Sequence, residues 1–242
     1  MIRLLALPLA VALVAPAQAQ SFDKCKKFFI NGYVTDFVKP PHGQLKDLCF
    51  DSFAVLYSGQ TKTAVFVVER LNKAQLEDAS DEERSNKFYE EARLPSAYRA
   101  TLADYKGQAG EQMYDRGHMA PAGDMPNVQS MAQSFSLANM VPQASKNNRG
   151  PWRSRVEMAT RKYVMRAKGD VIVFTGPVFE TVQTLGPNKV WIPTHLFKLV
   201  YDVETGRSWA HWIENTNAAK AGPPITHEEL MKRTGIRFIP QE

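Results

Sequence analysis

Short apolar runs rich in β-branched and aromatic residues recur along the chain, and they constrain its fold more than any other feature. Each run is about as long as a β-strand, and most are bounded by Gly, Asp, Lys or Pro. We expect strands at residues 53–57, 64–68, 171–174, 191–201 and 208–213. Because strands must bury their apolar faces against other layers, these runs form the framework of the predicted fold.

One segment between these runs, residues 151–168, has helical spacing instead. Pro151 suits the first turn of a helix, and Gly169 suits a left-handed residue just beyond its end. A second, charged helix is expected at residues 74–86. Gly and Pro are dense in residues 107–142, which predicts irregular backbone of the kind that carries functional residues when a scaffold holds it. The order of these segments predicts a mixed α+β fold.

The first residues have the pattern of an export signal. Arg3 is the only charged residue before Asp23, and residues 17–19 (Ala-Gln-Ala) fit the small-x-small rule at a cleavage site. The apolar run at residues 4–15 is shorter than the roughly 20 residues of a membrane-spanning helix, which favours a cleaved signal over a membrane anchor. We therefore expect a signal peptide at 1–19 and a single domain at 20–242, located in the periplasm or secreted.

The net charge bears on the class of substrate, and the cysteine content bears on the redox state of the compartment. Without the signal the chain carries 29 Lys and Arg (30 minus Arg3) against 25 Asp and Glu, a net charge of +4. Such a balance suits a polyanionic substrate, although many exported proteins are basic. An oxidising compartment favours a disulfide between Cys25 and Cys49, the alternative being two buried thiols. A zinc site would need more Cys and His at ligand spacing.

The densest polar cluster lies at residues 114–125 and places Asp115, Arg116 and His118 within four residues. Histidine accepts a proton from water near neutral pH, so His118 is a candidate general base. The fork of donors on Arg116 matches phosphate oxygens, and Gly117 lets the backbone approach a ligand or turn. The alternative is a surface loop that carries these charges incidentally.

A second polar cluster, residues 145–150, comes just before the predicted helix. Its Asn148 offers a hard, neutral oxygen that suits Mg²⁺. The helix then places Glu157 and Arg161, four residues apart, on one face. The alternatives are that the Asn and Ser residues cap the helix and that Glu157 and Arg161 form an ordinary surface ion pair.

Taken together, these clusters resemble the DNA/RNA non-specific endonucleases, which include secreted sugar-nonspecific nucleases and mitochondrial endonuclease G. The resemblance runs from about residue 55 to about residue 213 and implies the ββα-metal (His-Me finger) fold, with antiparallel sheets flanked by helices. The matching residues are Ala103-Asp104-Tyr105, Asp115-Arg116-Gly117-His118-Met119-Ala120-Pro121, Asn139-Met140-Val141-Pro142-Gln143, Asn148, Trp152, Glu157, Arg161 and Trp191-Ile192-Pro193-Thr194-His195-Leu196-Phe197-Lys198.

The resemblance implies a role for each matching residue at the reacting centre. His118 matches the general base that deprotonates the attacking water, and Asn148 matches the sole protein ligand of the catalytic magnesium. Glu157 matches an acid that orients water at the metal, and Asn139 an asparagine that supports the site. The step from Asn148 to Glu157 is one residue longer than in the relatives, which predicts an insertion around residues 153–155.

Arginines complete the implied site. Arg116 and Arg161 match arginines near the phosphate. Arg84, four residues before Phe88, resembles an upstream arginine that stabilises the scissile phosphate. We expect Asp115, together with Arg161, to contact the substrate.

The implied activity is hydrolysis of phosphodiester bonds in DNA and RNA with Mg²⁺, for which Mn²⁺ is an alternative. Contacts to phosphate carry no sequence information, so sequence-independent cleavage is expected. The oligomeric state is left open between monomer and homodimer. The main alternative is a catalytically impaired module of the same fold that binds nucleic acid. A serine hydrolase is disfavoured because the sequence has no G-x-S-x-G motif.

Overall fold

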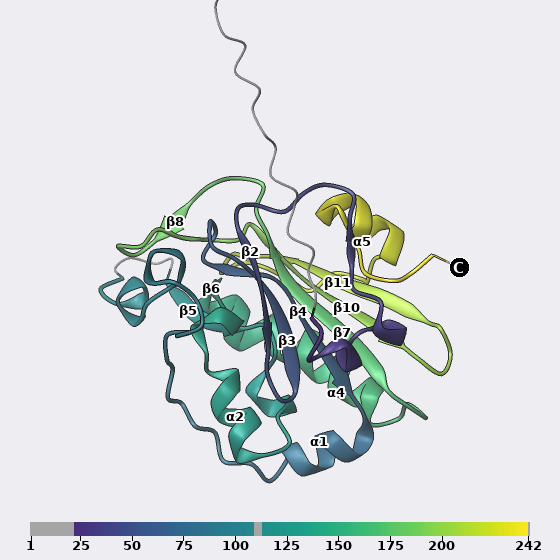
Figure 1. Cartoon of the computed structure of the whole chain (residues 1–242). Helices are drawn as coiled ribbons and strands as arrows, with labels where there is room; N and C mark the ends of the chain where they lie inside the picture. The colour runs from purple at the N-terminus through teal and green to yellow at the C-terminus, as the bar shows by residue number, and fades with distance from the viewer. Residues whose placement is uncertain (1–21, 109–112, 242) are drawn as a thin grey trace, which may run out of the picture.

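A six-stranded sheet forms the framework of the computed structural model, which describes residues 22–108 and 113–241. Every neighbouring pair of strands is antiparallel, in the order β11-β10-β7-β4-β3-β2 (Figure 1). The strands are β2 (Leu45–Cys49), β3 (Phe53–Ser58), β4 (Thr63–Leu71), β7 (Val171–Val178), β10 (His195–Asp202) and β11 (Ser208–Glu214). The sheet and the helices around it confirm the predicted α+β class.

Four of the five predicted strands lie within strands of this sheet, while the fifth is divided. The predicted run 191–201 splits into the end of β9 (Val190–Trp191) and the strand β10. The single strand was wrong because Pro193 lies between the two parts and has no N–H to donate to a ladder. Its carbonyl accepts a hydrogen bond from Nδ2 of Asn215 at 2.9 Å.

Alternate residues of each strand point to opposite faces of the sheet, and the two faces bury different side chains. Helix α5 (His227–Thr234) packs on one face, where Leu230 lies in the same apolar cluster as Phe66. Helices α1, α2 and α4 cover the other face (Figure 1). We call the first the aromatic face, after its seven buried phenylalanines on strands and flanking segments, and the second the site face. The seven are Phe22, Phe28, Phe29, Phe66, Phe174, Phe197 and Phe238.

Helix α1 (Lys73–Ala79) is shorter than the helix predicted at 74–86. It begins where Oδ1 of Asn72 accepts a hydrogen bond from the backbone N–H of Gln75 at 3.0 Å. It ends at Ala79, ahead of three consecutive acidic residues at 81–83. Negative charge is unfavourable at a helix C-terminus, so the acidic run opposes continuation of the helix.

The predicted helix at 151–168 is present, but both of its ends were misplaced. The helical segment consists of α3 (Ser145–Asn147), the π-helix η7 (Asn148–Glu157) and α4 (Met158–Val164). Pro151 therefore lies inside the segment, where it is tolerated because the backbone leaves helical geometry at Gly150 (φ −105°, ψ −106°). Gly169 is not left-handed. A Cβ there would lie 2.6 Å from Cγ of Glu204, whose exposed side chain would have to move.

The Gly- and Pro-rich region at 107–142 is more regular than predicted. Strand β5 (Tyr114–His118) pairs antiparallel with β6 (Met140–Ala144). The assignment of residues 115–118 to a loop was therefore wrong, because pairing with β6 satisfies their backbone groups. Helix α2 (Val128–Ser134) lies between the two strands in sequence and begins at Asn127, whose side chain accepts from the N–H of Ser130.

Smaller elements complete the fold. Two-residue strands form the pairs β1 (Asp36–Phe37) with β12 (Ile236–Arg237) and β8 (Thr184–Leu185) with β9. The short 3-10 helices are η1 (Lys26–Phe28), η2 (Ile30–Gly32), η3 (Ser96–Tyr98), η4 (Leu102–Tyr105), η5 (Ala122–Asp124) and η6 (Leu137–Asn139). The predicted signal peptide at 1–19 lies outside the described residues. Within the described ranges, no helix has the length and apolar character needed to cross a membrane.

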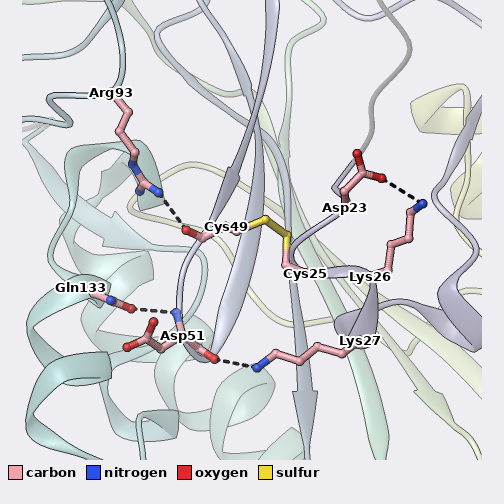
Figure 2. Close-up of a disulfide and its surroundings, with 8 residues drawn as sticks. All are labelled: Asp23, Cys25, Lys26, Lys27, Cys49, Asp51, Arg93 and Gln133. Atoms are coloured by element: carbon pink, nitrogen blue, oxygen red, sulfur yellow. Dashed lines mark hydrogen bonds and ion pairs between the residues drawn. A yellow bond between two sulfur atoms is a disulfide. The ribbon is translucent and has the colours of Figure 1, made fainter.

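The predicted disulfide between Cys25 and Cys49 is present, with an S–S distance of 2.05 Å. It joins the N-terminal segment to the end of β2, as Figure 2 shows. Nη1 of Arg93 donates to the carbonyl of Cys49 at 2.8 Å. The N–H of Asp51 donates to Oε1 of Gln133 on α2 at 2.8 Å. The disulfide belongs to the apolar cluster of the aromatic face, and Gln133 of α2 links the segment that follows β2 to the site face.

Candidate active site

The strand pair β5–β6 places His118 at the end of β5, opposite Met140. Gly117, the preceding residue, lies against the side chain of Gln143 on β6. A Cβ at this position would overlap that side chain, so the glycine allows close approach of the two strands. This differs from the prediction that Gly117 serves a turn or a ligand.

His118 is enclosed by aromatic rings and is 8% exposed. Its ring centroid lies 4.9 Å from that of Phe135 and 5.8 Å from that of Phe88. Burial, reinforced by the positive charges of Arg84 and Arg116, lowers the pKa of His118 to about 3. The imidazole is therefore neutral at physiological pH, the form that can accept a proton.

Asn139 fixes the chain directly after His118. Its buried Oδ1 accepts from the N–H of Ala120 at 2.8 Å. Its Nδ2 donates to the carbonyls of Ala120 at 2.9 Å and Ser134 at 2.8 Å. The backbone N–H of Met119 donates to the carbonyl of Asn139 at 2.9 Å. These bonds give Asn139 a positioning role next to the imidazole.

Asp115, two strand positions before Gly117, holds the residue expected to bind the metal. Its Oδ2 accepts from Nδ2 of Asn148 at 2.9 Å and from Nε of Arg149 at 2.8 Å, and its Oδ1 accepts from Ser145 at 3.0 Å. Burial favours a higher pKa for Asp115, but these hydrogen bonds outweigh it and lower the pKa. Because its carboxylate is engaged by these neighbours, contact between Asp115 and substrate stays a prediction.

The π-helix explains the long step from Asn148 to Glu157. Its hydrogen bonds run from i to i+5, so its turns take up more residues than α-helical turns. Nine residues along this segment bring Asn148 and Glu157 to the walls of one cavity. Residues 153–155, where an insertion was predicted, lie inside the π-helix, and the insertion itself stays a prediction.

Arg161 links Glu157 to a second carboxylate, Asp124 on η5. Its Nε forms a short ion pair with Asp124, while its Nη2 lies 3.9 Å from Glu157. Burial raises the pKa of Glu157, and the nearby charges of Arg161 and Lys198 oppose that effect. Of the two ion pairs that Arg161 forms, the predicted one with Glu157 is therefore the longer and weaker. Sequence reasoning missed the other partner, Asp124.

Two more charged residues lie beneath this cluster on the site face. Glu69 on β4 and Lys198 on β10 are each 1% exposed. Nζ of Lys198 donates to Thr175 at 2.7 Å and lies 6.0 Å from the ring centroid of Trp152. Burial and the charge of Asp124 hold the pKa of Glu69 well above its usual value, against the effect of Lys198. Glu69 and Lys198 each interrupt an apolar strand, and this was the sequence signal that could have identified them as buried charges.

The side chains converge on a cavity of about 420 Å³. His118, Asn148 and Glu157 line it together with five arginines, and Glu157 is the one acidic residue among its lining residues. The guanidinium of Arg116 lies 3.9 Å from the ring centroid of Phe88, and that of Arg84 lies 5.0 Å from the ring centroid of Phe135. The arginines are Arg84, Arg116, Arg149, Arg153 and Arg161.

Three of these arginines were predicted and two were not. Arg84, Arg116 and Arg161 reach the cavity as the resemblance implied. Arg149 and Arg153 were missed, although a four-residue spacing relates them to Glu157 and Arg161. That spacing is typical of one face of a helix, so it was the signal that could have identified them.

Comparison with known proteins identifies the family. The family model described as DNA/RNA non-specific endonuclease matches residues 31–240. The chain belongs to this family. It is 31% identical to the mitochondrial nuclease EXOG of Xenopus laevis over 78% of its own length and 56% of that protein. It is 32% identical to nuclease C1 of Cunninghamella echinulata (78% and 81%) and 32% identical to mitochondrial endonuclease G of Homo sapiens (86% and 74%).

A solved structure shares the fold. A chain in the crystal structure of the EndoG/EndoGI complex superimposes with a TM-score of 0.71 at 21% identity and covers 92% of both chains. The likeness confirms the ββα-metal nuclease fold of the DNA/RNA non-specific endonucleases. The β5–β6 pair carries His118, and the helical segment at 145–164 carries Asn148 and Glu157.

The cavity fits a magnesium ion of the kind that this family uses. Because Nδ2 of Asn148 donates to Asp115, its Oδ1 is left as a neutral oxygen ligand in a wall of the cavity. Mg²⁺ prefers such hard oxygens and keeps several waters. In the part of the chain that the structure describes, no group of three His, Cys, Asp or Glu side chains forms a further metal site.

Proposed function

We propose that this protein is an exported, metal-dependent endonuclease that hydrolyses phosphodiester bonds of DNA and RNA without sequence specificity. The observation that carries the proposal is one cavity that combines a neutral imidazole, an amide oxygen ligand and five arginines. Membership of the DNA/RNA non-specific endonuclease family supports the same activity.

His118 acts as the general base. Its burial keeps the ring neutral, and Asn139 and the flanking Phe88 and Phe135 restrict its orientation. A neutral imidazole takes the proton from a water molecule that attacks phosphorus in line with the leaving oxygen. General base catalysis of this kind contributes about 10²–10⁴-fold in rate.

The arginines bind and neutralise the phosphate. Guanidinium groups match phosphate oxygens in geometry and charge, so the arginine-lined cavity selects the backbone of a nucleic acid. Contacts to phosphate do not read base sequence, which accounts for cleavage of both DNA and RNA at any sequence. Arg116 and Arg84 lie beside His118 and are placed for the scissile phosphate.

The metal end of the cavity is organised by the helical segment. Asn148, held by Asp115, would ligate Mg²⁺ or Mn²⁺, and Glu157 would orient water next to it. When bound, the ion supplies positive charge that stabilises the phosphate and the leaving oxygen in the transition state. Arg161 restrains Glu157 through the ion pair described above.

Export to the periplasm or the medium is part of the proposal. The signal pattern at residues 1–19 supports it. The Cys25–Cys49 disulfide also supports it, because such bonds persist in oxidising compartments. Expression of the full chain, followed by N-terminal sequencing of the exported form, tests this part. A mature N-terminus near residue 20 is expected, and an uncleaved, retained chain would contradict export.

Digestion of supercoiled plasmid and of RNA by the purified mature chain tests the activity. We expect both substrates to be cut with Mg²⁺ or Mn²⁺ and neither to be cut with EDTA. Retention of nucleic acid in a gel-shift assay without metal-dependent cutting would identify a binding module instead and would overturn the proposal. Cutting that persists in EDTA would overturn its metal-dependent part.

A further inference from the structure

A second cavity, of about 540 Å³, lies on the other side of the π-helix from the catalytic one. Arg155 of the π-helix, His211 of β11 and Lys220 of the following loop line it, and no acidic side chain is among its lining residues. Arg155 and Lys220 are both exposed, and neither forms an ion pair with any residue in the described ranges. The hollow therefore carries uncompensated positive charge.

The loop that carries Lys220 is fixed to the same backbone that begins the helical segment. Oδ1 of Asn215 accepts from the N–H of Ala144 at 2.8 Å, and its Nδ2 donates to the carbonyl of Pro142 at 2.9 Å. Oδ1 of Asn217 accepts from the N–H of Lys146 at 3.1 Å. Both walls of the second cavity are thus joined to the segment that presents Asn148 to the catalytic cavity.

The position of the second cavity relative to the first suits a linear polyanion. Arg153 lines the catalytic cavity and Arg155, two residues later, lines the second. A strand that passes from one flank of a helix to the other must span at least its diameter, roughly 10–12 Å. At about 3.4 Å of helix axis per nucleotide of one strand, this spans about three nucleotides.

We propose that the second cavity is a phosphate subsite, which holds the sugar–phosphate backbone of the substrate about three nucleotides from the scissile bond. This inference rests on the proposed nuclease function and names a part of its substrate contact. Arg155 and Lys220 supply the charge that phosphate oxygens require. Because the contact is to phosphate, it serves DNA and RNA alike and adds affinity for long substrates over short ones.

A double substitution, Arg155→Gln with Lys220→Gln, tests the subsite. The matched control is Arg207→Gln with Lys232→Gln, which removes one Arg and one Lys from exposed positions on the β10–β11 turn and on α5. Both double variants lower the net charge by two. Any effect of overall charge is therefore shared, and any effect of the cavity is specific to the first variant.

Binding of a 20-bp duplex is measured in the His118→Ala background with EDTA, so that no substrate is cut. Each lost phosphate contact lowers the slope of log Kd against log salt by about 0.9. When salt rises from 50 to 200 mM, affinity falls by some factor in each protein. This factor should therefore be about tenfold smaller for the Arg155/Lys220 variant than for its parent. The slope for the control variant should differ from the parent slope by less than about half of the change expected for one lost contact.

Cleavage of substrates from 2 to 20 nucleotides separates this inference from the function on which it rests. With His118 intact, the advantage of long over short substrates in kcat/KM should fall in the Arg155/Lys220 variant and persist in the control. If the unsubstituted enzyme cuts no length, the proposed function fails. If it cuts, and the Arg155/Lys220 variant keeps both its length advantage and its salt slope, the subsite is wrong.

Discussion

The two faces of the six-stranded sheet come from alternate residues of the same strands, and both bury apolar side chains, but the site face also buries charged ones. The aromatic face packs phenylalanines against one another, with Phe66 and Phe174 centroids 5.8 Å apart in an edge-to-face arrangement. The site face buries Glu69 and Lys198 beneath the helical segment that carries Asn148 and Glu157. Burial of a charged group destabilises the folded state, whereas burial of an aromatic ring stabilises it.

This difference separates stability from activity in space. The aromatic face supplies apolar burial that offsets the cost of the charged groups on the site face. On the site face, His118 stays neutral because it is buried and because Arg84 and Arg116 lie near it. Substitutions on the site face should therefore act mainly on catalysis, and changes on the aromatic face mainly on stability.

The largest effect is expected at His118. His118→Ala removes the proton acceptor and should lower kcat by about 10²–10⁴-fold. Plasmid cleavage at saturating Mg²⁺ measures it. Retention of duplex binding and of a cooperative thermal transition in the variant serves as the control for folding. A variant that is folded and cuts at the unsubstituted rate would remove His118 from the mechanism.

The second largest effect is a loss of stability, expected when the disulfide on the aromatic face is removed. The Cys25–Cys49 disulfide closes a loop of 24 residues. Replacement of both cysteines by serine should therefore lower the free energy of unfolding by about 3 kcal/mol. Urea unfolding measures this loss, and kcat at a temperature where the variant is folded should stay within about twofold. A loss of kcat without a loss of stability would break the separation between the two faces.

A smaller effect on the site face is expected at Asp115. Asp115→Asn keeps the size of the side chain but weakens its bonds to Asn148 and Arg149. Loss of a group that orients a metal ligand typically costs about 10–100-fold in metal affinity or activity. The Mg²⁺ concentration for half-maximal rate should rise, while binding of duplex in EDTA changes little. An unchanged Mg²⁺ requirement would remove Asp115 from the support of Asn148.

Comparison of the two faces also shows what the sequence could predict. Four of the five expected strands, the disulfide and the clustering of His118 with Asn148 and Glu157 were predicted, because periodicity, compartment and clustered motifs are local signals. The geometry of the helical segment was not, since a π-helix depends on the packing of Trp152 and Val156 and on the break at Gly150. The buried Glu69 and Lys198 were not assigned a role either, because their meaning arises from contacts between distant segments.

The smallest effect concerns pH. His118 has a folded-state pKa of about 3 against an ordinary value of 6.5, so the unfolded chain binds more protons between these values. The stability that comes from this group is present above pH 6.5 and is lost as pH falls toward 3. Between pH 7 and pH 5 the unsubstituted protein should lose more free energy of unfolding than His118→Gln. Equal losses would mean that His118 is not held neutral by the fold.

The most direct test of the central claim, that a neutral His118 removes the proton from water, is chemical rescue. His118→Ala leaves a space between Phe88 and Phe135 that opens into the catalytic cavity. Added imidazole should restore plasmid cleavage in this variant, in proportion to the neutral imidazole present as pH rises from 6 to 8. Asn148→Ala should show no rescue. Cleavage by His118→Ala that does not respond to imidazole at any of these pH values would contradict the claim.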